Sequence, residues 1–546
     1  MASQQLAMDI CAIFIDHTAS QMTYLVSATI YKSKMSETNP SQSLRITWYA
    51  ATIFISSAIL LVLEITAGRL IAPYVGVSIY SWTSIIGVIL AGLSLGNWLG
   101  GRWADKDASD KHAGIVLALA GLFSMFSLLA LTFVAPLLQN SELDLVSSSF
   151  LYVLSMFFIP SVLLGIPTPL LTTFALRLDS RAGHIVGRMH ALAALGSIIG
   201  TFLTGFVFIQ YFGSHHVIIA SSILLLVLAI PFFRRTPKTT PVLMVTALIS
   251  LSLVTLARGG YANPCDRESN YFCLRVVDVS KEAPFGTAKA LILDHLIHGI
   301  NQETEPGMLI SPYVQLMDEL VLNHFEAHQI DQLNYFFAGG GSYTQPRAIN
   351  ALSPDAKITV AELDRAVTKL VTEKMYVSTE KMRIFHHDAR AVLYRLKGEL
   401  FDVIITDAFH DVAIPYHLVT REYAELVKSR LQPNGLYATN VVDAFPNAKM
   451  VKCMLKTLQQ EFNYVDVWLD HIPDQPQRMT FVISASDSPI NSDILRASRG
   501  FKRRWYRINT PLLETGTPLQ ELPVFTDDYV PVERMIAKLL LTSEGL

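Results

Sequence analysis

The stretch "FFAGGGSYTQPR", Phe336–Arg347, places three consecutive glycines between an apolar run and a more polar one. The apolar part is typical of a buried strand, and the residues after the glycines favour a helix. Glycine allows positive φ and close backbone approach, and the first turn of a helix has free N–H groups. The stretch therefore predicts either a loop that holds a nucleotide-like cofactor or a plain tight turn between a strand and a helix.

Strands and helices alternate on both sides of this turn. The predicted strands are 333–339, 357–363, 381–388, 401–407, 435–442, 464–469 and 479–485. The predicted helices are 345–352, 364–375, 389–397, 420–431 and 446–462. This alternation predicts a parallel, doubly wound, Rossmann-like α/β sheet. Two extended stretches before it, 271–280 and 288–299, predict a β-hairpin or small sheet.

Candidate binding residues follow successive predicted strands, where ligands of such sheets bind. They are Gly339, Gly340 and Gly341 after the first strand, Glu362 after the second, Asp388 after the third and Asp407 after the fourth. An acid about 20 residues beyond a glycine turn can accept hydrogen bonds from ribose hydroxyls, which fits Glu362. Asp388 could accept a hydrogen bond from an adenine amino group. An acid at a strand end can instead be a helix N-cap.

The loop lacks the spacing of phosphate-binding motifs. It contains neither GxGxxG nor GxxxxGK[ST], so ribose and adenine recognition without a pyrophosphate favours an S-adenosyl compound. The four cysteines are Cys11, Cys265, Cys273 and Cys453, and none forms a CxxC pair, so we expect no metal site. The net charge of −3 gives no reason to expect a nucleic acid partner.

The first half is far more apolar than the second. The whole chain is 51% hydrophobic and 16% charged, against about 25% charged in an average soluble protein. Seven apolar runs of near-spanning length are at 49–66, 80–101, 113–136, 148–176, 189–211, 215–233 and 239–257. The fourth is interrupted by "GIPTP", Gly165–Pro169, which should kink or end a helix.

We divide the chain into a lead-in, a helical membrane domain, a small β/helical region and a Rossmann-like domain. Their boundaries are 1–44, 45–258, 259–330 and 331–546. The predicted location is a cell (inner) membrane, crossed several times, with the lipid bilayer as a partner.

Basic residues follow the even-numbered runs, and excess Lys and Arg marks the cytoplasmic side. Seven crossings from an inside start would put the second half outside the cytoplasm. Cys265 and Cys273 fit that side, because a disulfide persists there, although they could be two unrelated thiols. A re-entrant run or a missed eighth crossing would put the second half inside, so its side stays open.

The second half resembles the aminopropyltransferases of the spermidine synthase family, which have a methyltransferase-like Rossmann fold. The motifs that carry the resemblance are "ESNYFCLRV" (268–276), "LILDHLIHG" (291–299), "SPYVQLMDE" (311–319), the glycine loop, "VAELD" (360–364), "HHDAR" (386–390) and "DVIITDAF" (402–409). "LEITAGRLIAPYVG" (63–76), "GSIIGTFLTGF" (196–206) and "TDDYVPVE" (526–533) resemble membrane-fused members.

The resemblance implies transfer of an aminopropyl group from decarboxylated S-adenosylmethionine to a polyamine such as putrescine. It implies that Glu362 binds ribose, that Asp388 binds adenine, and that Asp407 steers or deprotonates the attacking amine. The residues that it assigns to the substrate groove are Tyr313, Asp294, Gln315 and His410.

Three positions depart from the family pattern. Ser342 replaces the usual Asp after the glycines, Gln315 replaces a Glu, and His410 replaces an Asp. The hypotheses that stay open are therefore a methyltransferase that uses S-adenosylmethionine, and a transporter or sensor that binds polyamine or nucleoside without turnover. The sequence also leaves a homo-oligomer open.

Overall fold

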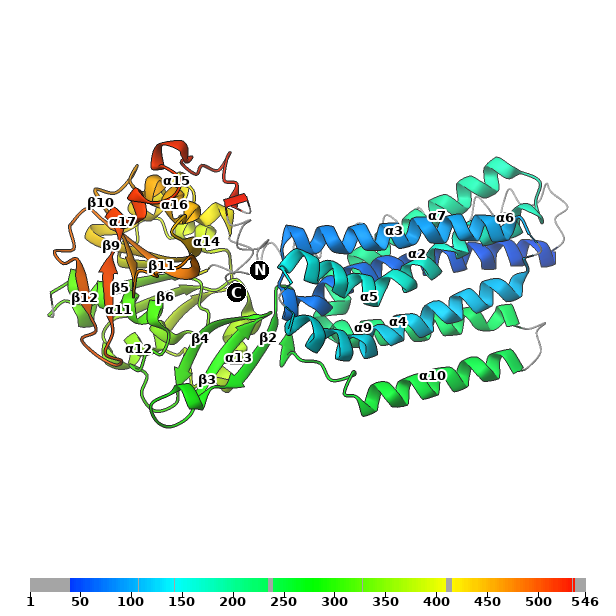
Figure 1. Ribbon diagram of the computed structural model, residues 1–546, viewed down its shortest axis with the longest axis horizontal. Helices are drawn as coiled ribbons and strands as arrows, with labels where there is room; N and C mark the ends of the chain where they lie inside the picture. Colours follow the sequence, from blue (N-terminus) through cyan, green and yellow to red (C-terminus); the bar gives the residue numbers. More distant parts are fainter. Residues whose placement is uncertain are drawn as a thin grey trace.

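The computed structural model describes residues 40–106, 108–141, 143–233, 239–326, 328–408, 415–532 and 534–535. It has two parts, a bundle of long helices and an α/β domain attached to one end of the bundle (Figure 1). The bundle elements are α2 (Pro40–Val75), α3 (Ile79–Ala104), α4 (Asp110–Gln139), α5 (Leu145–Gly165), α6 (Pro167–Leu176), α7 (Ala182–Leu203), the π-helical turn η2 (Thr204–Phe208), α8 (Ile209–Phe212), α9 (Ser214–Ala229), the 3₁₀ turn η3 (Ile230–Phe233) and α10 (Thr239–Ala257).

Among the described residues, six helical segments are long and apolar enough to cross a membrane. They start at Gln42, Ile79, Asp110, Leu145, Ala182 and Ser214, which matches the first six predicted runs. The seventh run coincides with α10, whose apolar part, Val242–Ala257, is shorter. The predicted break occurs at Gly165–Pro167, where α5 ends and α6 begins.

Glycines bring the helices of the bundle into backbone contact. A Cβ at Gly96 of α3 would lie 2.1 Å from the Val162 carbonyl oxygen of α5. A Cβ at Gly200 of α7 would lie 2.4 Å from the Ala58 carbonyl oxygen of α2. Such close approach is how membrane helices gain packing energy without a hydrophobic driving force between them.

The α/β domain begins with a small antiparallel sheet, as the two extended stretches predict. Its strands are β1 (Arg267–Glu268), β2 (Cys273–Asp278), β3 (Ala288–Leu293) and β4 (Leu296–Gln302), hydrogen-bonded in that order. Helix α11 (Pro312–His324) then leads to the main sheet.

The main sheet has nine described strands in the order β12-β13-β10-β11-β9-β8-β5-β6-β7. They are β5 (Asn334–Ala338), β6 (Lys357–Ala361), β7 (Met382–Phe385), β8 (Phe401–Thr406), β9 (Leu431–Phe445), β10 (Tyr464–Leu469), β11 (Gln477–Ser486), β12 (Ile494–Arg496) and β13 (Arg504–Arg507). The helices are α12 (Thr344–Leu352), α13 (Arg365–Lys374), α14 (Ala389–Arg395), α15 (Arg421–Lys428), α16 (Lys449–Leu458) and α17 (Asn509–Glu514).

The predicted parallel pairing is correct for one side of this sheet. Strands β5 to β9 pair in parallel, whereas β11 pairs antiparallel with both β9 and β10. The reason is the short connection 470–476 between β10 and β11, because parallel neighbours need a crossover of about a dozen residues. The fold class is therefore a polytopic helical bundle followed by a Rossmann-like sheet that is parallel over β5 to β9 and antiparallel over β9, β11, β10, β13 and β12.

Candidate functional site

The glycine turn follows β5 at the edge where β5, β6, β7 and β8 end, which we call the carboxyl edge. Gly339 and Gly341 have φ values of 98° and 50°, so both adopt conformations that favour glycine. A Cβ at Gly339 would lie 2.3 Å from the carbonyl oxygen of Asp407. The glycines therefore allow the turn to lie directly against the end of β8.

Glu362 lies beside this turn, at the end of β6. Its Oε2 accepts a hydrogen bond from the Gly340 N–H at 2.8 Å, and its Oε1 accepts one from the Asp364 N–H at 2.8 Å. The side chain is buried, and burial raises the pKa of the Glu362 carboxyl to about 7, although the N–H donors oppose the shift. Each carboxylate oxygen keeps a further lone pair for a ligand hydroxyl.

Asp388 follows β7 and is the N-cap of α14. Its Oδ1 accepts from the Ala391 N–H at 2.9 Å, and its Oδ2 lies 2.6 Å from His417 Nε2. Burial works to raise the pKa of Asp388, but the His417 and Ala391 hydrogen bonds outweigh it and leave that pKa below its ordinary value. The sequence gives no signal for His417, which is in the 3₁₀ turn Tyr416–Leu418.

Asp407 follows β8 and faces the glycine turn. The Tyr313 hydroxyl of α11 lies 3.4 Å from Asp407 Oδ2. Burial raises the pKa of Asp407 to about 6, and hydrogen bonds from Asn440 and Tyr313 moderate the shift. Asn440 could have been found in the sequence, because it is a polar residue inside the apolar run of the neighbouring strand β9.

A small hollow joins the glycine turn to Asp407. Its lining consists of turn backbone, small hydroxyl side chains and apolar groups from the strand ends. The lining residues are His298, Val314, Phe337, Gly339, Gly340, Ser342, Thr344, Gln345, Pro346, Ile405 and Asp407. Neither Glu362 nor Asp388 lines the hollow itself, so they belong to the same edge but not to the same small cavity.

The other predicted substrate residues divide into three cases. Gln315 donates to the carbonyl oxygens of Arg499 and Phe501, which ties α11 to the C-terminal segment. Asp294 is buried in the β3–β4 turn, where its Oδ1 accepts from the Cys273 N–H at 2.9 Å. His410 lies outside the described residues.

The edge thus brings together the glycine turn, Glu362, Asp407 and Tyr313, with Asp388 at the next strand. Within the described part of the chain, no group of three His, Cys, Asp or Glu side chains could hold a metal ion.

Residues 326–494 match the family described as the spermine/spermidine synthase domain. The chain is 34% identical over 105 residues to a polyamine aminopropyltransferase of Vibrio vulnificus, which covers 19% of this chain and 34% of that protein. It is 22% identical over 211 residues to a probable polyamine aminopropyl transferase of Bifidobacterium longum, which covers 36% of this chain and 47% of that protein. The chain therefore spans less than half the length of these two relatives.

A solved structure of a probable spermidine synthase from Corynebacterium glutamicum aligns with a TM-score of 0.41 and 19% identity, covering 48% of this chain and 95% of that one. The matched residues 326–494 include the glycine turn and the three carboxylates of the carboxyl edge. The resemblance noted in the sequence is therefore confirmed over this region, where residues 326–494 are similar to the spermine/spermidine synthase domain.

Proposed function

We propose that this chain is a membrane-tethered aminopropyltransferase that moves an aminopropyl group from decarboxylated S-adenosylmethionine to a polyamine such as putrescine. The observation that carries the proposal is the position of Asp407, a carboxylate beside the glycine turn and the Tyr313 hydroxyl, inside a matched synthase domain. The proposed reaction needs a ligand that offers ribose hydroxyls to the carboxyl edge and an electrophilic carbon to the amine.

The carboxyl edge fits the adenosyl part of such a ligand. Gly340 lets the Tyr343 ring and Glu362 pack against the turn, because a Cβ there would lie 2.5 Å from the Tyr343 ring and 3.1 Å from Glu362 Oε2. Glu362 would accept hydrogen bonds from the two ribose hydroxyls, and Asp388 would accept one from the adenine amino group. The adenosyl sulfonium supplies a carbon that is activated by a positively charged sulfur, which leaves as a thioether.

Asp407 would act on the incoming amine. An alkylammonium must lose a proton before its nitrogen can form the new C–N bond while the C–S bond breaks. The Asp407 carboxylate can take that proton and hold the amine in line. Because its pKa is raised to about 6, Asp407 is a better base than an ordinary carboxylate and is still ionised at neutral pH.

Calorimetry and turnover test this function. The full chain in detergent should bind decarboxylated S-adenosylmethionine more tightly than the carboxylated form, and it should transfer the aminopropyl group to putrescine. Tighter binding of the carboxylated form, with methyl transfer, would instead support a methyltransferase, which the neutral Ser342 leaves room for.

A second candidate function, binding without turnover, rests on the side of the membrane. The structure forms the Cys265–Cys273 disulfide, a bond that persists outside the cytoplasm. The start of α2, the end of α3, the start of α4, the end of α6 and the start of α7 lie remote from the α/β domain (Figure 1). Near these helix ends in the sequence are the basic residues Arg45, Arg102, Lys106, Lys111, Arg177, Arg181 and Arg188. Both observations support an external α/β domain, away from the cytoplasmic supply of the cofactor.

Thiol labelling on intact cells separates the two sides. We would place single cysteines at two exposed positions, Asp474→Cys in the α/β domain and Lys106→Cys at the remote end of α3. A membrane-impermeant maleimide that labels Asp474→Cys but not Lys106→Cys would support the external domain and the binding function. The reverse pattern would support the transferase.

A further inference from the structure

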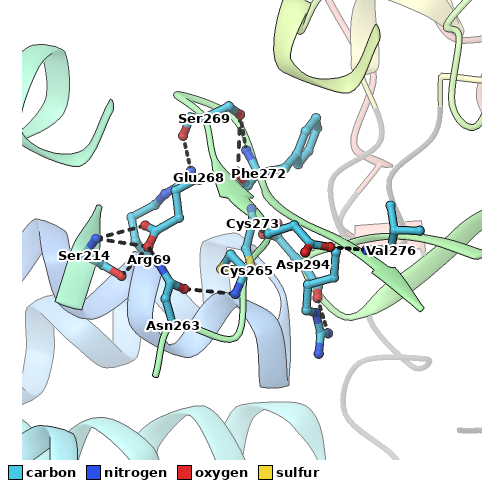
Figure 2. Close-up of a disulfide and its surroundings, with 12 residues drawn as sticks. Arg69, Ser214, Asn263, Cys265, Glu268, Ser269, Phe272, Cys273, Val276 and Asp294 are labelled. Carbon is cyan, nitrogen blue, oxygen red and sulfur yellow. Dashed lines mark hydrogen bonds between the residues drawn. A yellow bond between two sulfur atoms is a disulfide. The ribbon is translucent and has the colours of Figure 1, made fainter. Parts of the chain in front are cut away.

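A short segment, residues 263–273, connects the bundle to the carboxyl edge, and we call it the docking segment. It follows α10 and runs through β1 to the start of β2 (Figure 2). It is braced by the Cys265–Cys273 disulfide and by a hydrogen bond from the Cys265 N–H to Asn263 Oδ1 at 2.9 Å. The segment is therefore held in one shape by its own bonds.

On the membrane side, the docking segment is bound by two helices of the bundle. Arg69 of α2 donates to the carbonyl oxygen of Tyr271 at 2.6 Å and also to that of Ser269. The Glu268 carboxylate accepts from the Ser214 N–H at 3.0 Å and from the Ser214 hydroxyl at 3.0 Å, at the first residue of α9 (Figure 2). Each of the two attachments, to α2 and to α9, therefore contains hydrogen bonds with a charged group, Arg69 in the first and Glu268 in the second.

On the other side, the same segment contacts the carboxyl edge. The Ser269 hydroxyl donates to Asp364 Oδ2, and both side chains are buried. The Asp364 N–H then donates to Glu362 Oε1 at 2.8 Å, while Asp364 Oδ1 caps α13 through the Ala366 N–H at 2.9 Å.

We propose that Arg69 is a positioning residue for Glu362, acting through Ser269 and Asp364, so that the membrane bundle sets the geometry of the ligand-binding carboxylate. Arg69 contacts only backbone carbonyls of the docking segment in the hydrogen bonds described. The relay reaches the glycine turn, because Glu362 Oε2 also accepts from the Gly340 N–H. The ligand side of the inference rests on the proposed function, but the relay itself does not.

Hydrogen exchange tests the relay without any ligand. The variants are Arg69→Gln, Arg69→Lys and Ser269→Ala, each in the full chain in detergent. Peptides that contain the Gly340 and Asp364 amides should exchange faster in Arg69→Gln and Ser269→Ala, with partial recovery in Arg69→Lys. The matched control is Arg177→Gln, because Arg177 also donates to two backbone carbonyls, those of Ala104 and Ala108, within the bundle.

Ligand affinity gives the second measurement. The dissociation constant for decarboxylated S-adenosylmethionine should rise roughly 2- to 30-fold in Arg69→Gln and in Ser269→Ala, the usual range for coupling through a contact network. The double variant should show less than the sum of the two effects, because both act on one relay. Arg177→Gln should leave the constant unchanged.

The two measurements fail separately. If exchange at Gly340 and Asp364 is the same in Arg69→Gln, Ser269→Ala and the unchanged chain, the relay is wrong whatever the ligand. If exchange changes as expected but the unchanged chain binds no adenosyl sulfonium, the relay stands and the proposed function is wrong.

Discussion

The helical bundle and the carboxyl edge are both tightly packed, but burial stabilises the fold in the bundle and disfavours the charged form of the carboxyls at the edge. In the bundle, Gly96 and Gly200 let helix backbones touch, and the contacts stabilise the fold. At the carboxyl edge, Glu362 and Asp407 are carboxyls whose pKa is raised by burial. Such groups make the folded state less stable as pH rises from their ordinary pKa to the raised one.

Buried carboxyls with strongly shifted pKa values lower the stability of the folded state, and they cluster at functional sites. Changes to the carboxylates of the carboxyl edge should therefore alter binding and turnover most, and changes at the glycine contacts of the bundle should alter stability most.

The largest effect should come from Asp407→Asn. The amide cannot accept the proton, so transfer should fall about 10²- to 10⁴-fold, the usual contribution of a general base. Cofactor affinity should stay within about tenfold (~1.4 kcal/mol). Steady-state turnover and calorimetry measure both quantities.

Asp402→Asn is the matched control for this change, because Asp402 is on the same strand and its Oδ2 accepts from the Asn334 N–H at 2.8 Å, away from the glycine turn. Full turnover in Asp407→Asn would remove that residue from the mechanism.

A smaller effect, on stability, should come from Gly96→Ala in the bundle. The new methyl group would meet the Val162 carbonyl oxygen of α5, and overpacking of this kind costs typically 1–3 kcal/mol. Gly87→Ala on the same helix has no atom within 4 Å and should be neutral or slightly stabilising. Thermal unfolding in detergent measures the pair, and an equal response in both would contradict the packing argument.

Glu362→Gln should weaken cofactor binding by roughly 1–3 kcal/mol, because one polar partner of the ribose becomes poorly matched. Unfolding stability should fall as well, because the NH₂ group of Gln would face one of the two backbone N–H donors, of Gly340 and Asp364, that the carboxylate accepts; binding is therefore measured under conditions where both chains are folded. Glu399→Gln serves as the control, because Glu399 pairs with Arg383 on the surface. Unchanged affinity in Glu362→Gln would mean that the ligand binds elsewhere.

The smallest effect should be the pH dependence of kcat/KM. Below pH 6 the Asp407 carboxyl is protonated and cannot accept a proton, so kcat/KM should rise about tenfold per unit and level off above the pKa of about 6. Glu362 has a pKa of about 7, so its ionisation would affect cofactor binding between about pH 6 and pH 8. A profile that is flat from pH 5 to 8 would show that neither carboxyl is needed in its charged form.

Much of the fold could be predicted, because apolar runs are local signals. The predicted strands and helices around the glycine turn all have counterparts in the structure. Helix α11 was not predicted, since its sequence "PYVQLMDELVLNH" contains two buried acids. Their partners are remote in the chain: Asp318 binds Arg499, and Glu319 binds the Ser498 N–H.

The candidate site was predictable where a strand end alone decides the position, as for Glu362 and Asp407. It was not predictable where a side chain's partner comes from elsewhere. Gln315 is engaged by the segment around Arg499, Asp294 by the Cys273 N–H, and Asp388 by His417. These side chains have the composition expected of a binding groove, but long-range contacts decide what each one does.

The contact between Arg69 and the docking segment also bears on how the chain is made. Arg69 and Ser269 are 200 residues apart, and the helices between them must pack into the bundle before the two can meet. During synthesis the α/β domain therefore emerges after the helical bundle, and the Arg69 contact can form only late. A chain with a misassembled bundle would lack the hydrogen bonds of Arg69 to the docking segment. On the proposed relay, Glu362 would then be poorly positioned even if the α/β domain had folded.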